Sequence, residues 1–513
     1  MEATCDVDAE LSDQISALIK PPSPDQGLGF IDESESLCLK QEYFEELLKS
    51  RNCVGLKVKP ESDLGKGVYA DVEFGEGELV LKDQMLVGAQ HSSNKVDCLV
   101  CSHCFCFVGS VELQIGRKLC LQELGLSSSD ECASSPMDGI HDSPNGDHDN
   151  LGSCSSSDFK EKVSLPKEIV ASLMNGQLAL PYSERFALPS VVPCPGGCGE
   201  AYYCSKLCAG TDWELSHSLL CTGKGSQAIC REALLKFVGH ANETNDIFLL
   251  AAKAIAFTIL RYKKLKLYGL QGQQQDEHAK QNGQSGSEFS LLLEVWKPMS
   301  MGFKRRWWEC VALPEDVDCC DEVSFRKQIR DLASMSLQLL KQAIFDKECA
   351  PCITVPIEIS FLHCDLVVAS PVEDYFLYID DLPPDDKETA EMITRPILDA
   401  LGDDYSVCCQ GSAFFPLQSC MNHSCQPNAK AFKRDEDRDG QATIIALRTI
   451  LKGEEITVSY IDESLPLEDR RTQLADYGFK CRRKRDLNLN HLHSSELTYA
   501  VHGFESESYI RRD

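Results

Sequence analysis

The sequence predicts a mixed α+β fold, in which one β-rich domain is interrupted by a cysteine-rich segment and a helical insertion. Two similar patterns, at residues 67–81 and 444–460, each place apolar strands on both sides of a Gly/Glu turn and predict two hairpins of that domain. Cysteine and histidine recur at the spacing of metal ligands between residues 194 and 221. Apolar residues recur at helical spacing between about residues 230 and 345.

Length and charge restrict the class of protein. The 513 residues exceed one ordinary core and indicate two or three domains. The chain carries 80 acidic and 51 basic residues, a net charge of −29, which excludes a generally basic nucleic-acid coat and favours a basic partner. The first residues lack the apolar run of a secretory signal. The longest apolar stretch, residues 247–260, is too short to cross a membrane and predicts a buried helix.

The first half of the chain divides into a tail, a β part and the cysteine-rich segment. We expect an acidic tail over residues 1–46, with helical spacing from residue 38 to 50, and the first part of the β domain over residues 47–97. The cysteine-rich segment covers residues 98–221. Its insert at about residues 126–158 is rich in Ser, Asp, Asn and Gly, a composition typical of disorder.

The second half completes the β domain. A helical insertion is expected over residues 222–398, with a polar linker at 271–288 and a helix at 386–401. Residues 399–481 form the second part of the β domain and end in a helix at 467–477, between Pro466 and Gly478. Residues 482–513 are a divergent polar tail.

The cysteine-rich segment has the spacing of a zinc site. Zinc prefers four tetrahedral thiolate or imidazole ligands. Between residues 194 and 221 the segment contains six candidate ligands: Cys194, Cys198, Cys204, Cys208, His217 and Cys221. A pair from Cys98, Cys101 and Cys104 completes the eight ligands that two zinc ions need, and both 98/101 and 101/104 have suitable spacing. The competing interpretation is a set of reduced, buried cysteines.

This segment resembles a MYND finger, including Tyr203 before Cys204 and Trp213 before His217. The resemblance implies two interleaved structural zinc sites and a protein-docking role. It favours the pair 101/104, because Phe105 follows that pair as an aromatic residue does in this family. The gap from Cys104 to Cys194 is longer than usual. The implied ligand sets are Cys101, Cys104, Cys204 and Cys208 for one zinc, and Cys194, Cys198, His217 and Cys221 for the other.

A second set of motifs flanks the finger. Gly65-Lys66-Gly67 precedes it, and Asn422-His423-Ser424-Cys425-Gln426-Pro427-Asn428 follows it. Residues 454–460 (EEITVSY) and 477–481 (YGFKC) come next. Each motif alone has an ordinary interpretation, such as a glycine turn or a core tyrosine. In this order they resemble a SET domain over residues 47–481, in the SMYD-like build of plant Trithorax-related SET proteins, where a MYND finger splits the SET domain.

The resemblance implies transfer of a methyl group from S-adenosylmethionine to a lysine amine. Gly65, Lys66 and Gly67 would form a turn whose backbone approaches the cofactor. Asn422 and His423 would present side-chain and backbone groups to it, within the segment that forms the SET pseudoknot. Tyr460 would lie at the methyl-transfer point. Phe479 would pack over the cofactor and line the lysine channel beside Tyr477.

The chemistry agrees with these residue types. The attacking lysine must be neutral, although its ordinary pKa is about 10.4. A narrow aromatic channel beside a sulfonium cation lowers the pKa of that lysine by desolvation and like-charge repulsion. Tyr460→Phe should therefore lower turnover more than cofactor affinity.

One departure concerns a third zinc. SET proteins of this build carry a CxCxxC cluster after the segment at 477–481, and it binds zinc together with the cysteine of the NHSC motif. Here only Cys425 and Cys481 are present, because residues 482–485 are basic. The third zinc is therefore in doubt. Either this C-terminus comes from an alternative transcript or gene model, or this form of the protein lacks the third zinc. The basic run is either a solvated tail or a contact to nuclear import factors or nucleosomal DNA.

The resulting hypothesis is a nuclear, and also cytoplasmic, lysine methyltransferase with the histone H3 tail or nucleosome as substrate. The acidic charge suits a basic tail, and non-histone substrates stay open. Transcription factors or corepressors would bind the finger. No membrane association and no strong sequence-specific DNA binding are expected. The alternative is a catalytically weak, zinc-dependent scaffold that recruits transcription regulators.

Overall fold

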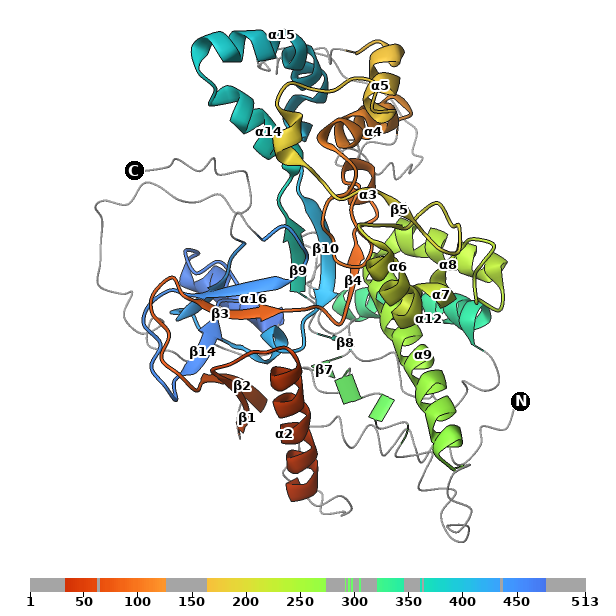
Figure 1. Cartoon of the computed structure of the whole chain (residues 1–513). Coiled ribbons are helices and arrows are strands. Elements are labelled where there is room, and N and C mark those ends of the chain that lie inside the picture. Colours follow the sequence, from red (N-terminus) through yellow and green to blue (C-terminus); the bar gives the residue numbers. More distant parts are fainter. Residues whose placement is uncertain are drawn as a thin grey trace, which may run out of the picture.

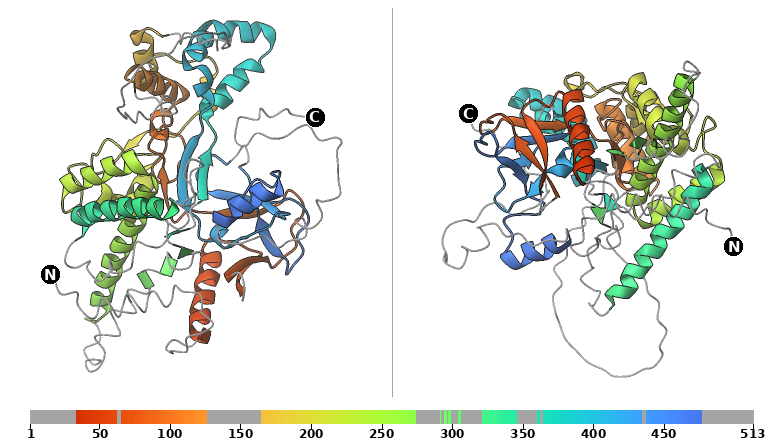
Figure 2. Two further views of the ribbon diagram at one scale, coloured as in Figure 1. Left: turned by 180° about the vertical axis from the view of Figure 1, so that it is seen from behind. Right: turned by 90° about the horizontal axis from the view of Figure 1, so that it is seen from below.

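The computed structural model describes residues 33–61, 65–125, 164–273, 321–345, 364–433 and 437–476, together with short stretches between residues 291 and 361. Figure 1 shows a β-rich part at the left, helices at the right and top, and a sheet running between them. The two further views in Figure 2 show the same three parts. The insert at 126–158, most of the linker at 271–288 and the tail at 482–513 lie outside the described residues, as do Tyr477, Phe479 and Cys481.

The β-rich part contains two sheets built from both ends of the chain. The first has the strand order β1-β2-β14-β11, in which only the pairing of β11 with β14 is parallel. Its strands are β1 (Leu56–Glu61), β2 (Gly65–Ala70), β11 (Asn422–His423) and β14 (Glu455–Val458). The second sheet is antiparallel, with the order β12-β13-β3, and its strands are β3 (Leu79–Asp83), β12 (Ala429–Ala431) and β13 (Ala442–Ala446).

The two predicted hairpins are wrong, although their strands exist. β2 does not pair with β3, and β13 does not pair with β14; instead β2 pairs with β14 and β3 with β13. A bridge between Phe74 and Ile450 joins the two connecting loops. The loop in each pattern is too long for a tight two-residue hairpin. The two strands of one pattern therefore pair with the strands of the other pattern. This exchange joins the two halves into one β domain.

One core holds this domain together. Val68, Leu81, Ile444 and Ile456 from the exchanged strands are all buried in it. Helix α2 (Glu33–Ser50), which contains the predicted helix at 38–50, adds Phe44 and Leu48 to the same core. Helix α16 (Leu467–Asp476) follows β14, in agreement with the predicted last helix.

A central sheet connects the β-rich part with the rest. It has the order β4-β10-β9 and is antiparallel, with the strands β4 (Val87–Gln90), β9 (Cys364–Val368) and β10 (Cys409–Phe414). Strand β9 lies inside the insertion that was predicted to be helical. Its apolar run is short enough for a buried strand, and periodicity alone does not distinguish that from a helix.

The cysteine-rich segment forms small elements beside a helical layer. Helix α3 (Asn94–Asp97) directly precedes the segment, and α4 (Val111–Glu123) lies in it before the insert. The elements after the insert are α5 (Lys167–Met174), η2 (Ser183–Phe186), β5 (Val192–Pro193), β6 (Tyr202–Tyr203), α6 (Lys206–Asp212), η3 (Trp213–His217) and α7 (Ser218–Leu220). The layer against it contains α8 (Arg231–Thr244), α9 (Ile247–Gln273) and α12 (Glu322–Ile344). Leu250, Ala256 and Ile259 are buried, as predicted for a helix at 247–260. Among the described helices, none has the length and apolarity to cross a membrane.

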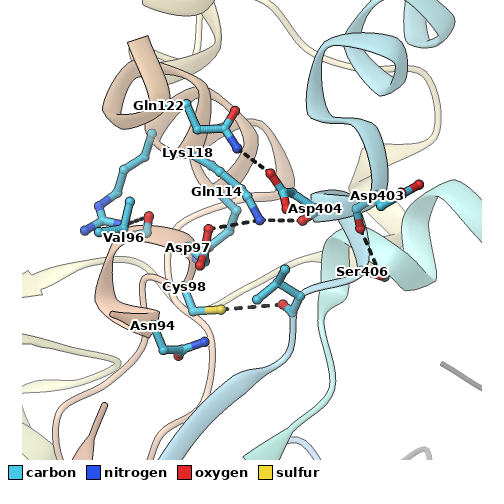
Figure 3. A network of polar contacts seen from close by, with 12 residues as sticks. Asn94, Val96, Asp97, Cys98, Gln114, Lys118, Gln122, Asp403, Asp404 and Ser406 are labelled. Atoms are coloured by element: carbon cyan, nitrogen blue, oxygen red, sulfur yellow. Dashed lines mark hydrogen bonds and ion pairs between the residues drawn. The ribbon is translucent and has the colours of Figure 1, made fainter. Parts of the chain in front are cut away.

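A second helical group lies at the top of Figure 1, where α4 and α5 meet α14 and α15. The remaining elements of the insertion are β7 (Lys304–Arg305), β8 (Ser360–Phe361), α14 (Pro371–Asp380), α15 (Pro384–Leu401) and η4 (Gly402–Ser406). Figure 3 shows the polar contacts that join α4 to the chain leading into β10. Lys118 forms a buried ion pair with Asp97 at 3.1 Å and donates to the carbonyl of Asp404, and Gln122 donates to the Asp404 carboxylate at 2.8 Å.

Candidate active site and zinc clusters

Gly67 lies where β2, β11 and β14 meet. A Cβ atom at this position would be 3.0 Å from the ring of Tyr69, 3.2 Å from Glu455 Oε1 and 3.3 Å from Asn422 Nδ2. The Gly65–Gly67 motif does not form the predicted turn, because these residues begin strand β2 and pair with β1. The glycine is needed here for close approach.

Asn422 ties the two sides of this position together. Its Nδ2 donates to the carbonyl of Lys66 at 2.9 Å and to Glu455 Oε1 at 2.8 Å. Both amide hydrogens are therefore used within the protein, and the remaining polar atom is the acceptor Oδ1. Sequence reasoning missed Glu455, because nothing in a Glu-Glu pair says which of the two carboxylates faces a strand neighbour.

The buried His423 holds Tyr460 in place. Its Nδ1 accepts a hydrogen bond from the backbone N–H of Tyr460 at 3.1 Å, so the ring proton is on Nε2, which lies 3.2 Å from Cys425 Sγ. Both ring nitrogens are thus engaged by protein groups. Of the side-chain and backbone groups that Asn422 and His423 were expected to present to a cofactor, the backbone of His423 remains for that contact.

The Tyr460 hydroxyl has a fixed direction. It donates to the backbone carbonyl of Met421 at 2.5 Å, and the ring lies half-buried beside His423 with the ring centroids 5.4 Å apart. Because its proton is used, the phenolic oxygen presents its lone pairs to any further partner. Such an oxygen can accept a hydrogen bond from an amine.

Asn428 fastens residues 422–428 to strand β14. Its Oδ1 accepts from the backbone N–H of Thr457 at 2.8 Å, and its Nδ2 donates to the carbonyl of Glu455 at 2.8 Å and to Glu454 Oε1 at 3.1 Å. Arg448 pairs with Glu454 at 2.6 Å and lowers the pKa of that carboxyl to about 2. These contacts agree with the pseudoknot that the sequence predicts for this segment.

An ion pair beneath the site orients the chain that leads into Asn422. Asp83, fully buried at the end of β3, pairs with Arg51 and accepts from the backbone N–H groups of Leu417 (2.8 Å) and Gln418 (2.9 Å). Burial raises the pKa of Asp83, and the Arg51 charge opposes that shift. Sequence reasoning missed this pair. The available signal was an acidic residue, Asp83, at the end of an apolar strand. Its partner could not be predicted, because tertiary packing determines it.

The first cysteine cluster contains Cys101, Cys104, Cys204 and Cys208, whose sulfurs lie within 4.8 Å of one another. Three of the sulfur–sulfur distances are 3.6 Å (104–204), 3.4 Å (204–208) and 4.0 Å (208–104). Zinc–sulfur bonds of about 2.3 Å in a tetrahedron place the sulfurs about 3.8 Å apart. The donors therefore fit a zinc ion. Cys98 lies elsewhere, with its thiol toward the carbonyl of Val407.

The second cluster contains Cys194, Cys198, His217 and Cys221. His217 Nε2 lies 3.1 Å from the sulfur of Cys194 and 3.6 Å from that of Cys198, and the sulfurs of Cys194 and Cys221 are 3.7 Å apart. These separations also fit tetrahedral zinc. The π-helical turn η3 brings His217 into the cluster, and burial lowers the pKa of its imidazole, which favours the neutral, ligating form.

A surface hollow of about 510 Å³ lies between α6 and α9, away from the strands described above. Leu207, Leu215, Phe257 and Arg261 are among its lining residues, and it contains none of the residues around Gly67 and Tyr460. It is therefore separate from the candidate active site.

Comparisons with known proteins agree with these features. The SET domain family matches residues 65–461. The histone-lysine N-methyltransferase ATXR2 of Arabidopsis thaliana is 58% identical over 491 residues, which cover 94% of this chain and 98% of that protein. Shorter matches include the human protein-lysine N-trimethyltransferase SMYD5, 37% identical over 16% of this chain and 20% of that protein, and the human N-lysine methyltransferase SMYD2, 43% identical over 14% and 16%.

Proposed function

This chain belongs to the SET-domain family of protein-lysine methyltransferases, and on that premise we propose that it methylates histone H3 in the nucleus. Two facts support a histone tail as the substrate. The relative that matches most of the chain is named a histone-lysine N-methyltransferase. The net charge of −29 attracts a lysine- and arginine-rich tail and raises its rate of association.

We assign cofactor contacts to the place where β2 and β11 meet. S-adenosylmethionine supplies an electrophilic methyl group on a sulfonium sulfur. In this proposal the backbone of Gly65, Lys66 and Gly67 contacts the cofactor, and a side chain at position 67 would crowd Glu455 and Asn422. Asn422 Oδ1 is an acceptor suited to the ammonium group of an amino acid. His423 contributes through its backbone, because its ring nitrogens already have protein partners.

Tyr460 orients the substrate amine. Its hydroxyl proton is held by Met421, so its lone pairs accept an N–H of the lysine and align the nitrogen for in-line attack. Tyr477 and Phe479 complete the lysine channel in this proposal. The aromatic surroundings keep the amine neutral by desolvation.

The two cysteine clusters hold structural zinc ions in this proposal, with four protein ligands each and no position for a water molecule. Their role is to fold the finger, which then binds transcription factors or corepressors. Cys425 is hydrogen-bonded to His423. With Cys481 it supplies only two ligands, and the proposal does not include a third zinc.

The hydroxyl of Tyr460 carries the mechanistic proposal, and its removal tests it. Tyr460→Phe should lower kcat by at least about a hundredfold, which corresponds to about 2.7 kcal/mol, while the Kd for S-adenosylmethionine changes by less than about threefold. Tyr202→Phe is the matched control, because the Tyr202 hydroxyl also donates to a backbone carbonyl, that of Gly199 at 2.8 Å, but Tyr202 lies in the β5-β6 sheet and not in the sheet that contains β14. Equal turnover in the Tyr460→Phe and Tyr202→Phe variants would contradict the proposal.

A further inference from the structure

A fifth thiol lies against the first cysteine cluster. Cys106 Sγ is 3.4 Å from Cys104 Sγ, as short as any sulfur–sulfur distance measured within the cluster. Cys106 is not one of the four residues whose sulfurs surround a common point. Nothing in the ligand spacing of the finger uses this residue.

The backbone holds Cys106 in this place. The N–H of Cys101 donates to the carbonyl of Cys106 at 2.8 Å, and the N–H of Phe105 donates to the carbonyl of Cys101 at 2.8 Å. Phe105 has φ = 62°, a left-handed conformation that is unusual for a bulky residue. Its side chain is fully buried, and Gly88 and Gly440 pack so closely that a Cβ on Gly88 would contact the ring and one on Gly440 would contact the Cβ of Phe105. This turn therefore fixes the two thiols, at 104 and 106, side by side.

We propose that Cys106 is a reserve zinc ligand of the first cluster, which takes the place of Cys104 when that thiolate is lost. The inference rests on the proposed zinc binding of this cluster. In the exchange, the zinc–sulfur bond to Cys104 breaks, a bond to Cys106 forms, and the proton of the Cys106 thiol passes to the Cys104 sulfur. Where Cys104 is replaced, that proton goes to water. The first site thereby keeps four thiolates.

The second cluster lacks this feature. In the part of the chain that the structure describes, no additional thiol is within hydrogen-bond distance of Cys194, Cys198, His217 or Cys221. Across the first cluster, the sulfur contacts of Cys208 among the described residues are with Cys204 and Cys104, so no described thiol outside the cluster stands ready to replace it. The proposal therefore predicts a difference between ligands of one site as well as between the two sites.

Zinc content of the purified full chain tests the proposal. We expect two zinc ions per chain for wild type, Cys106→Ser and Cys104→Ser, and one for Cys104→Ser/Cys106→Ser, Cys208→Ser and Cys198→Ser. Cobalt substitution gives a second measurement. The thiolate-to-cobalt charge-transfer intensity should be the same in Cys104→Ser as in wild type, and should fall in the double variant.

The outcomes separate the two proposals. One zinc in Cys104→Ser, as in the double variant, would overturn the reserve role. A Cys104→Ser chain that fails to fold while Cys208→Ser folds, judged by circular dichroism, would do the same. Fewer than two zinc ions in wild type would instead overturn the proposed zinc binding, on which the inference depends.

Discussion

At the scale of single residues, the candidate active site consists of side chains that fix one another. His423 positions the backbone of Tyr460, Met421 directs the Tyr460 hydroxyl, and Asn422 joins Lys66 to Glu455. Because these contacts fix the positions of the side chains, small changes in shape should alter cofactor binding or turnover before they alter the fold.

Gly67→Ala tests the close approach at β2. The new methyl group would lie 3.2–3.3 Å from Glu455 and Asn422, so both side chains must move. We expect the affinity for S-adenosylmethionine, measured by calorimetry, to fall by roughly tenfold, or about 1.4 kcal/mol. Gly75→Ala is the control, since its nearest neighbour would be 3.6 Å away. An unchanged affinity in Gly67→Ala would show that this strand does not contact the cofactor.

Asp83→Asn tests the ion pair beneath the site. The substitution leaves Arg51 without its buried counter-charge and weakens the hold on the N–H groups of Leu417 and Gln418. The free energy of unfolding should fall by about 3 kcal/mol in urea titrations. Asp71→Asn is the matched control, because its pairs with Lys57 and Lys452 are exposed and should matter little. Equal effects of the two changes would contradict a structural role for Asp83.

Residue roles could be predicted from the sequence only in part. The motif order placed Asn422, His423 and Tyr460 together, and the structure does bring them to one place. The hydrogen bonds of the His423 ring and the close contacts around Gly67 depend on atomic packing, which cannot be read from a sequence motif. Arg51 and Asp83 lie outside every motif, so their pairing was not predictable.

At the scale of elements, strand exchange produces the site. β14 lies between β2 and β11, so residues from both ends of the chain meet within one sheet. Strand positions followed from the apolar patterns, but strand partners did not. Pairing depends on long-range packing, and the local turns misleadingly favoured hairpins. The cysteine spacing was more informative, because metal ligands restrict geometry more than apolar residues do.

Asn428→Ala tests how the segment at 422–428 is fastened. It leaves the buried N–H of Thr457 and carbonyl of Glu455 without their side-chain partner, which should cost about 3 kcal/mol of unfolding free energy. Methyl transfer should fall as well, because Asn422 and His423 lie on the same segment. The exposed Asn175, changed to Ala, is the control. Wild-type stability in Asn428→Ala would rule out this fastening.

Removal of zinc tests the finger as an element. Incubation with a strong chelator should release both ions and lower the melting temperature of the chain, because the short elements around the clusters bury little apolar area without metal. Zinc release should be followed by a colorimetric indicator during the same titration. A melting temperature that is unchanged after complete release would contradict a structural role for the metal.

At the scale of the whole molecule, a buried polar junction connects the finger side to the catalytic side. Asn94 donates to the carbonyl of Cys408 at 2.8 Å and accepts from the N–H of Gln410 at 3.0 Å, next to the contacts of Lys118 with Asp97 and Asp404 (Figure 3). Long insertions are tolerated because such contacts and the central sheet hold their ends.

Label transfer from S-adenosylmethionine to intact histone octamers tests the central claim most directly. The full chain is incubated with octamers and methyl-labelled cofactor, and the histones are then separated and digested. We predict that the wild-type chain places label on lysine residues of H3, and that the Tyr460→Phe variant places none. Label confined to other histones, or none in wild type at any enzyme concentration, would contradict the account and favour a scaffold that binds regulators through its finger.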